Sequence, residues 1–193
     1  MSFGRVLRVV LFVVLTVVVA AAPAFAISAK EKQEKQKEVQ KMSQQTLSKL
    51  YKAQPSARKA VQNSAGYATF SNFGVKILLA GSGSGSGMAV DSKTKKVTYM
   101  KMIEVQAGLG IGVKKFSVVF VFDTQKALND FVNSGWEFGG QTTAAAKAGD
   151  KGAEFAGAVS VAPGVWMYQL TDTGLAAEIT GKGTKYYKDS DLN

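Results

Sequence analysis

Residues 116–135, FSVVFVFDTQKALNDFVNSG, decide the fold class of this chain. The segment 116–122 is almost entirely β-branched or aromatic, which predicts a buried strand. Asp123 or Thr124 can then cap a helix, and Gly135 can end it. The apolar face of that helix consists of Ala127, Leu128, Phe131 and Val132. A strand that leads directly into a docked helix predicts an α+β architecture, with helices packed on an antiparallel sheet or on a partly closed barrel.

From Gly66 onward, the sequence is rich in β-branched and aromatic residues, with frequent glycine and runs of alternation. These features predict a mostly antiparallel, glycine-rich β region. The predicted strands are 67–70, 76–90, 97–103, 105–113, 116–122, 136–146, 154–161, 166–171 and 175–181. Turns are predicted at 91–96, at Lys114 and Lys115, at Pro163 and Gly164, and at Thr173 and Gly174.

Residues 28–53 contain neither glycine nor proline and are dense in Lys, Glu and Gln, which predicts a helix. Its first part, 30–38, is polar all round, and its second half is amphipathic. The apolar stripe consists of Val39, Met42, Leu47, Leu50 and Ala53. This stripe could lie on a membrane, but it lacks the Trp and Phe that interfacial helices favour, so docking on the sheet is the preferred interpretation. Pro55 then allows a short second helix, 56–62.

The segment 81–87, GSGSGSG, has two interpretations. Its composition is that of a flexible linker. Its glycines, however, fall at every second position, which suits a strand with one face close against another element. The residues by themselves leave both interpretations open.

The first 26 residues have the pattern of a secretory signal peptide. Arg5 and Arg8 form a positive segment, residues 9–22 are apolar except for Thr16, and small residues precede a cleavage position after Ala26. A retained anchor is the alternative, but a spanning helix needs roughly 20 apolar residues and this run stops at Pro23. We therefore expect a chain that begins near Ile27 and is periplasmic or secreted, or peripheral on a membrane.

The formal net charge of the chain is +10, of which Arg5 and Arg8 supply two. The remaining positive excess favours anionic partners. Export argues against nucleic acid, which leaves anionic lipid headgroups, acidic polysaccharide or acidic protein surfaces. Basic composition is weak evidence by itself, because it also keeps proteins soluble.

The sequence contains no cysteine and no histidine. Disulfides, thiolate nucleophiles and the usual transition-metal ligands are therefore excluded, together with the commonest general base. The glycine-rich stretches match neither the dinucleotide-binding nor the P-loop pattern. We predict a protein that is not an enzyme and that carries no cofactor and no metal ion.

Several segments, in order, resemble the SYLF domain family. They are AGYATFSNFGVK (65–76), GSGSGSGMAVD (81–91), VQAGLGIGVKKFSVVFVFDTQKALNDFVNSGWEFGG (105–140) and GLAAEITGKGTKYY (174–187). The resemblance implies that 81–87 belongs to the folded domain and that the protein binds rather than catalyses. It also implies one folded unit, made of a helical segment, 27–64, and a SYLF-type β-rich domain, 65–193.

Two groups of residues are candidates for contact with a ligand. Lysines at predicted turns would form one basic rim if those turns lie at the same end of the sheet, and they could then bind lipid headgroups. These are Lys93, Lys95, Lys96, Lys114 and Lys115. Aromatic residues could line an apolar ligand cavity, although core packing is the simpler account. These are Trp136, Phe138, Trp166 and Tyr168.

The resemblance, the signal and the charge together predict an envelope protein that binds anionic phospholipid or an acyl ligand. The alternative is a periplasmic interaction or scaffold module that contacts an envelope protein partner through the helix 28–53.

Overall fold

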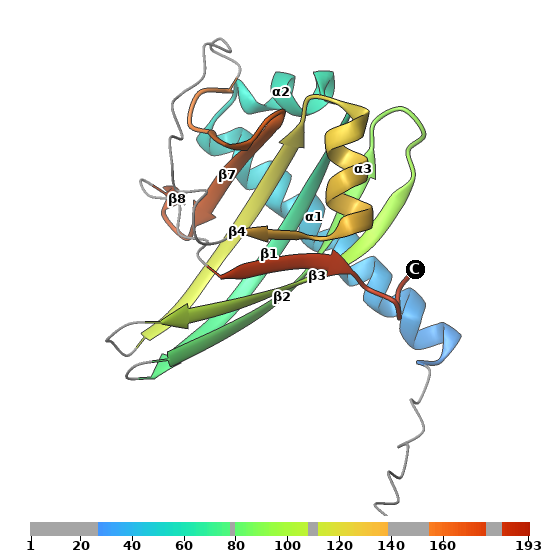
Figure 1. Cartoon of the computed structure of the whole chain (residues 1–193), viewed down its shortest axis with the longest axis vertical. Helices are drawn as coiled ribbons and strands as arrows, with labels where there is room; N and C mark the ends of the chain where they lie inside the picture. Colours follow the sequence, from blue (N-terminus) through green and yellow to red (C-terminus); the bar gives the residue numbers. More distant parts are fainter. Residues whose placement is uncertain (1–26, 78–79, 108–111, 139–154, 177–182) are drawn as a thin grey trace, which may run out of the picture.

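The computed structural model describes residues 27–77, 80–107, 112–138, 155–176 and 183–193. Within these ranges the chain forms three helices and one antiparallel sheet of nine strands (Figure 1). The expected α+β class is confirmed. The signal segment, 1–26, lies outside the described residues.

The sheet is ordered β5-β9-β3-β2-β1-β4-β7-β6, with β8 paired to β7. The strands are β1 (Gly66–Ile77), β2 (Ala80–Asp91), β3 (Val97–Ala107), β4 (Gly112–Phe122), β5 (Trp136–Phe138), β6 (Val159–Ala162), β7 (Val165–Thr171), β8 (Gly174–Leu175) and β9 (Thr184–Lys188). The strand that is latest in the sequence, β9, therefore lies between β5 and β3.

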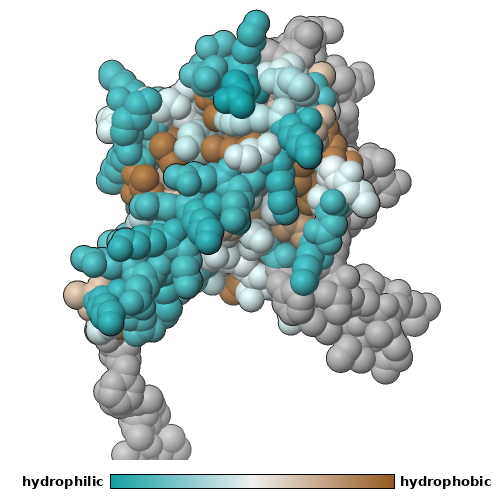
Figure 2. Space-filling model, turned by 180° about the vertical axis from the view of Figure 1, so that it is seen from behind, coloured by the Kyte–Doolittle hydropathy of each residue, from teal (hydrophilic) through white to brown (hydrophobic). Residues whose placement is uncertain are grey.

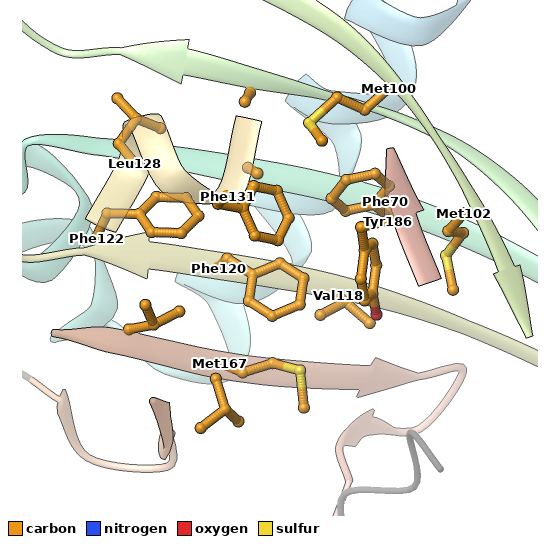
Figure 3. Close-up of a cluster of buried hydrophobic side chains, with 14 of the residues drawn as sticks. Phe70, Met100, Met102, Val118, Phe120, Phe122, Leu128, Phe131, Met167 and Tyr186 are labelled. Carbon is orange, nitrogen blue, oxygen red and sulfur yellow. The ribbon is translucent and has the colours of Figure 1, made fainter. Parts of the chain in front are cut away.

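The sheet curls toward a partly closed barrel. Tyr186 of β9 lies with its ring centroid 4.7 Å from that of Phe70 on β1 and 5.0 Å from that of Phe120 on β4. Since β3, β2 and β1 separate β9 from β4 in the sheet, these rings meet only because the sheet bends around them. Figure 3 shows the rings of Tyr186, Phe70 and Phe120 gathered on this concave side.

The three helices are α1 (Ala29–Ala53), α2 (Ala57–Asn63) and α3 (Gln125–Ser134). Thr124 accepts a hydrogen bond from the Ala127 amide at 3.2 Å and caps α3, and Gly135 ends the helix with φ of 68°. The cap is thus Thr124, one of the two residues that the sequence allowed. α3 packs inside the curl and α1 crosses the opposite, convex face (Figure 1).

Each face of the sheet carries its own core. Inside the curl, Phe70, Phe120 and Phe122 pack against Phe131 and Leu128 of α3. On the convex face, buried apolar side chains form two separate clusters, and α1 contributes Leu50 to one and Val39 to the other. The docked interpretation of the α1 stripe is confirmed for these two residues.

The segment 81–87 is part of β2, as the SYLF resemblance implies. Its glycines allow large side chains from neighbouring strands to lie over β2. A Cβ atom at Gly87 would overlap the Phe70 ring, and one at Gly85 would come too close to Met102. Since successive residues of a strand point to opposite faces, the serines between these glycines face the convex side.

The structure corrects several predicted boundaries. β1 is one long strand, whereas 67–70 and the start of 76–90 were predicted as separate pieces. The turn predicted at Lys114 and Lys115 is wrong, because β4 runs through both residues and pairs with β1. The predicted break at Glu104 is also wrong, because β3 continues through it.

The later part of the chain agrees in part with the predicted strands. β9 was not predicted at all. The predicted strands 136–146 and 175–181 are described only at their beginnings, as β5 and β8. A strand was predicted at 154–161, and the structure has a shorter strand there, β6, which begins only at Val159.

Candidate functional site

The turn between β2 and β3 presents lysines at one end of the sheet. Asp91 fixes this turn, because its carboxylate accepts hydrogen bonds from the amides of Lys93 and Thr94, both at 2.8 Å, and from Gln125 at 2.7 Å. These hydrogen bonds, first of all the one from the Thr94 amide, lower the pKa of Asp91. The turn is therefore well ordered by local contacts.

The side chains of Lys93, Lys95 and Lys96 are exposed at this turn. Within the described part of the chain, none of these three lysines forms an ion pair. Lys95 has φ of 61°, a left-handed conformation that is uncommon for a residue other than glycine. Such backbone strain concentrates where the surrounding structure fixes a loop.

Lys188 of β9 joins the same end of the sheet. Two hollows, of about 120 and 390 Å³, are both lined by Lys96, Thr98 and Lys188. The smaller hollow lies against α3, where Lys188 donates a hydrogen bond to Asn133 at 2.9 Å. We call Lys93, Lys95, Lys96 and Lys188 the basic end. Sequence reasoning missed Lys188 because β9 was not predicted and its pairing with Met100 is not visible in the sequence.

Lys114 and Lys115 lie near the opposite end of the sheet. They pair with Gly74 and Phe73 of β1, whereas the lysine-bearing turn follows the end of β2 that pairs with Gly66. Lys115 is exposed, and the side chain of Lys114 lies outside the described residues. The five predicted lysines therefore do not form a single rim.

The predicted aromatic residues lie on different faces of the sheet. Trp166 and Tyr168 are buried in the convex core, whereas Trp136 packs on the concave side with its ring centroid 5.5 Å from that of Phe120. The side chain of Phe138 lies outside the described residues. The three described side chains therefore serve core packing and do not line one common cavity.

A buried polar cluster lies beside the aromatic core. Asn72 donates a hydrogen bond to the Glu104 carboxylate at 2.5 Å, and Thr184 pairs with Glu104 on the neighbouring strand. Among the residues that the structure describes, Asn72 Oδ1 and Thr184 Oγ1 find no hydrogen-bond partner. Burial, with a smaller contribution from the charge of Glu104, raises the pKa of Tyr186 far above its ordinary value.

The described residues contain no group of three or more acidic side chains that could hold a metal ion. None of the described helices is long and apolar enough to cross a membrane.

Comparison with known proteins gives two similarities. Residues 103–193 match the family model Ysc84, described as "Las17-binding protein actin regulator". A relative from Aeromonas veronii, beta cell expansion factor A, is 31% identical over 151 residues, which cover 78% of this chain and 56% of the relative. The chain thus spans about half the length of the curated relative that it matches.

The curled sheet with its enclosed helix, together with these similarities, defines a β-rich domain of the SYLF type. Residues 103–193 carry the similarity to the Ysc84 family. Ysc84 and SYLF are two names for one domain family. The family indicated by the sequence resemblance is therefore confirmed.

Proposed function

We propose that this protein is a lipid-binding module that uses the basic end to contact anionic headgroups at a membrane surface. The observation that carries the proposal is the convergence of Lys96, in the turn before β3, and Lys188 of β9 on two adjoining hollows. Lysines near an anionic surface contribute about 1 kcal/mol each. The four lysines of the basic end would therefore suffice for a weak, reversible membrane association.

The proposal includes export of the protein. Residues 1–26 carry the pattern of a cleaved signal, and the positive net charge of the chain favours contact with an anionic surface. The mass of the protein recovered from intact cells tests this part, because cleavage after Ala26 leaves a chain that starts at Ile27.

Vesicle sedimentation tests the binding. The chain from Ile27 onward should sediment with phosphatidylglycerol vesicles at low salt, and it should remain in solution with phosphatidylcholine vesicles or at high salt. The double variant Lys96→Gln/Lys188→Gln should lose about 2 kcal/mol, which corresponds to roughly 30-fold weaker binding. Glutamine at position 188 can still donate a hydrogen bond to Asn133.

A matched control separates the site from the total charge. Lys41 and Lys52 are exposed on α1, and Lys41→Gln/Lys52→Gln removes the same charge from a different surface. Equal losses in both double variants would show a general charge effect and would contradict the assignment to the basic end. No sedimentation of the unchanged protein with anionic vesicles would refute lipid binding itself.

A further inference from the structure

The smaller hollow at the basic end, of about 120 Å³, lies between α3 and the first residues of β3. It is found where β9 stops, because the pairing of β9 with β3 ends at Met100 and Lys188, whereas β3 begins at Val97. The larger hollow, of about 390 Å³, adjoins it and shares Lys96, Thr98 and Lys188 as lining residues. Figure 1 shows the turn between β2 and β3 beside α3 at this end of the molecule. We call the smaller hollow the α3 pocket.

Two asparagines of α3 bring free hydrogen-bond donors to the α3 pocket. Asn129 and Asn133 are four residues apart, so they share one face of the helix, and both line the pocket. The side-chain oxygen of Asn133 accepts a hydrogen bond from Lys188 at 2.9 Å, and that of Asn129 accepts one from Gln125 at 3.4 Å. Gln125 also donates to Asp91 at 2.7 Å, which fixes its amide. Within the described part of the chain, neither asparagine NH₂ group donates to the protein, so both remain available to a ligand.

The α3 pocket also carries an excess of positive charge. Lys96 and Lys188 line it, and among the described residues neither lysine forms an ion pair. Asp91 is the one acidic side chain in its described lining. One carboxylate oxygen of Asp91 accepts hydrogen bonds from two backbone amides of the turn, and the other accepts one from Gln125. Both oxygen atoms of the acid are therefore occupied, and the two lysines leave a net positive charge for a ligand.

The donors that surround the α3 pocket suit a compact anion with several oxygen atoms. Lysine ammonium groups and asparagine NH₂ groups only donate hydrogen bonds, and the hydroxyl group of Thr98, which also lines the pocket, can donate one. A terminal phosphate group presents three acceptor oxygens and a charge of about −1.5 to −2 at pH 7. A phosphate diester or a carboxylate presents only two such oxygens and a single charge. The number of donors therefore favours a terminal phosphate.

We propose that the α3 pocket binds the phosphate group of a phosphomonoester. The proposal rests on the proposed contact between the basic end and anionic headgroups, and it names the chemical group that enters the pocket. The larger hollow, which is also lined by Val97, Tyr99 and Leu192, takes up the organic part that carries the phosphate. The same phosphate group occurs on phosphatidic acid and on soluble phosphate esters.

Titration with glycerol 3-phosphate at constant ionic strength tests the pocket by NMR of the ¹⁵N-labelled chain from Ile27 onward. The side-chain NH₂ signals of Asn129 and Asn133 should shift and saturate, whereas dimethyl phosphate, a diester, should shift them only weakly. The variant Asn129→Ala/Asn133→Ala keeps the net charge. Followed through the Thr98 backbone amide, it should bind glycerol 3-phosphate about 30-fold more weakly, or roughly fivefold for each lost hydrogen bond. Thermal unfolding of the variant checks that the fold is retained.

A matched control removes two amide groups from another helix. The hydrophilic outer surface of α1 crosses the face seen in Figure 2 as a diagonal band. The variant Gln44→Ala/Gln45→Ala removes two exposed side-chain amides of α1, a helix that contributes no residue to the α3 pocket. It should bind glycerol 3-phosphate as tightly as the unchanged protein. The proposal is overturned if both double variants lose affinity equally, or if glycerol 3-phosphate causes no saturable shift of the Asn129 and Asn133 signals.

Vesicle sedimentation distinguishes a lipid from a soluble ester as the source of the phosphate. At equal surface charge, phosphatidic acid vesicles should sediment more protein than phosphatidylglycerol vesicles. Asn129→Ala/Asn133→Ala should remove this preference and leave the binding to phosphatidylglycerol. Equal sedimentation with both lipids, combined with saturable binding of glycerol 3-phosphate, would assign the pocket to soluble esters.

The failure of the pocket and the failure of lipid binding give different results. Equal sedimentation with both lipids and no binding of glycerol 3-phosphate would overturn the phosphate site, while the proposed contact of the basic end with a membrane would stand. Saturable binding of glycerol 3-phosphate without sedimentation by either lipid would support the phosphate site and refute lipid binding.

Discussion

The two faces of the sheet differ in what they bury. The concave face holds one continuous apolar core in which Phe70, Phe120, Phe131 and Tyr186 meet edge to face or tilted. On the convex face, the two apolar clusters are accompanied by buried polar residues of α1 and β1, including a hydrogen bond of 2.8 Å from Thr69 to Ser43. The concave face also buries polar residues, Asn72, Glu104 and Thr184. The two faces therefore differ in the continuity of their apolar packing, which is one connected core on the concave side and two separate clusters on the convex side.

The alternation in β2 produces this difference directly. Glycine on the concave side lets Phe70 and Met102 lie across the strand, and serine on the convex side leaves short hydroxyl groups in a hollow beside α1. One sequence repeat with a period of two thus serves packing on one face and polarity on the other. Substitutions on the two sides of β2 should therefore change the free energy of unfolding by unequal amounts.

The largest effect is expected for Gly87→Ala. The new methyl group would overlap the Phe70 ring and the Thr69 carbonyl oxygen, and the backbone oxygen cannot move away easily. We expect a loss of about 3 kcal/mol in the free energy of unfolding, measured by urea denaturation. The neighbouring Ser86→Ala, on the other face, should change it by less than about 0.5 kcal/mol. Equal effects would show that the alternation does not separate the two faces.

A smaller effect is expected from the buried Tyr186 hydroxyl group at high pH. Its raised pKa means that the folded protein keeps this proton after the unfolded chain has lost its own. Stability should therefore fall above about pH 10, by about 1.4 kcal/mol per pH unit from this residue. Burial also raises the pKa of the half-buried Tyr51 and Tyr67, so a weaker slope should remain in the variant Tyr186→Phe.

Thermal unfolding between pH 9 and 11 measures this slope. Tyr187→Phe, at the adjacent position whose side chain faces the other side of β9, serves as the matched control. The assignment fails if Tyr186→Phe keeps the full dependence on pH.

The smallest effect is expected on the convex face, at the hydrogen bond between Thr69 and Ser43. Both residues are almost fully buried, so Thr69→Val leaves the Ser43 hydroxyl group without this partner and should cost about 1–2 kcal/mol. Adding Ser43→Ala should recover part of the loss, because replacing both partners with apolar groups is nearly neutral. A double-mutant cycle measures the coupling, and strictly additive losses would mean that the hydrogen bond contributes nothing.

Local signals in the sequence predicted the helices well. Thr124 and Gly135 bound α3, and Ser28 caps α1, because capping depends only on neighbouring residues. The strand breaks predicted at Glu104 and at Lys114 were wrong because a charged residue within a strand resembles a turn. In the structure, Glu104 is buried and receives a hydrogen bond from Asn72, a partner on another strand that no local pattern reveals.

The candidate surfaces were harder to predict than the helices. Lys93, Lys95 and Lys96 lie in a turn, as predicted, but their separation from Lys115 depends on the register between β1 and β4. The position of Lys188 in the basic end likewise depends on the register between β3 and β9. Such registers follow from the pairing of distant segments, so a single sequence does not specify them.

The position of β9 has a consequence for the order of folding. Tyr186 packs on Phe70 and Phe120, which precede it by 116 and 66 residues, so the concave core cannot close until β9 has been synthesised. Contacts between such distant segments slow folding, because a long loop must be closed before they form. The chain should consequently remain unfolded for longer than a helical protein of its size.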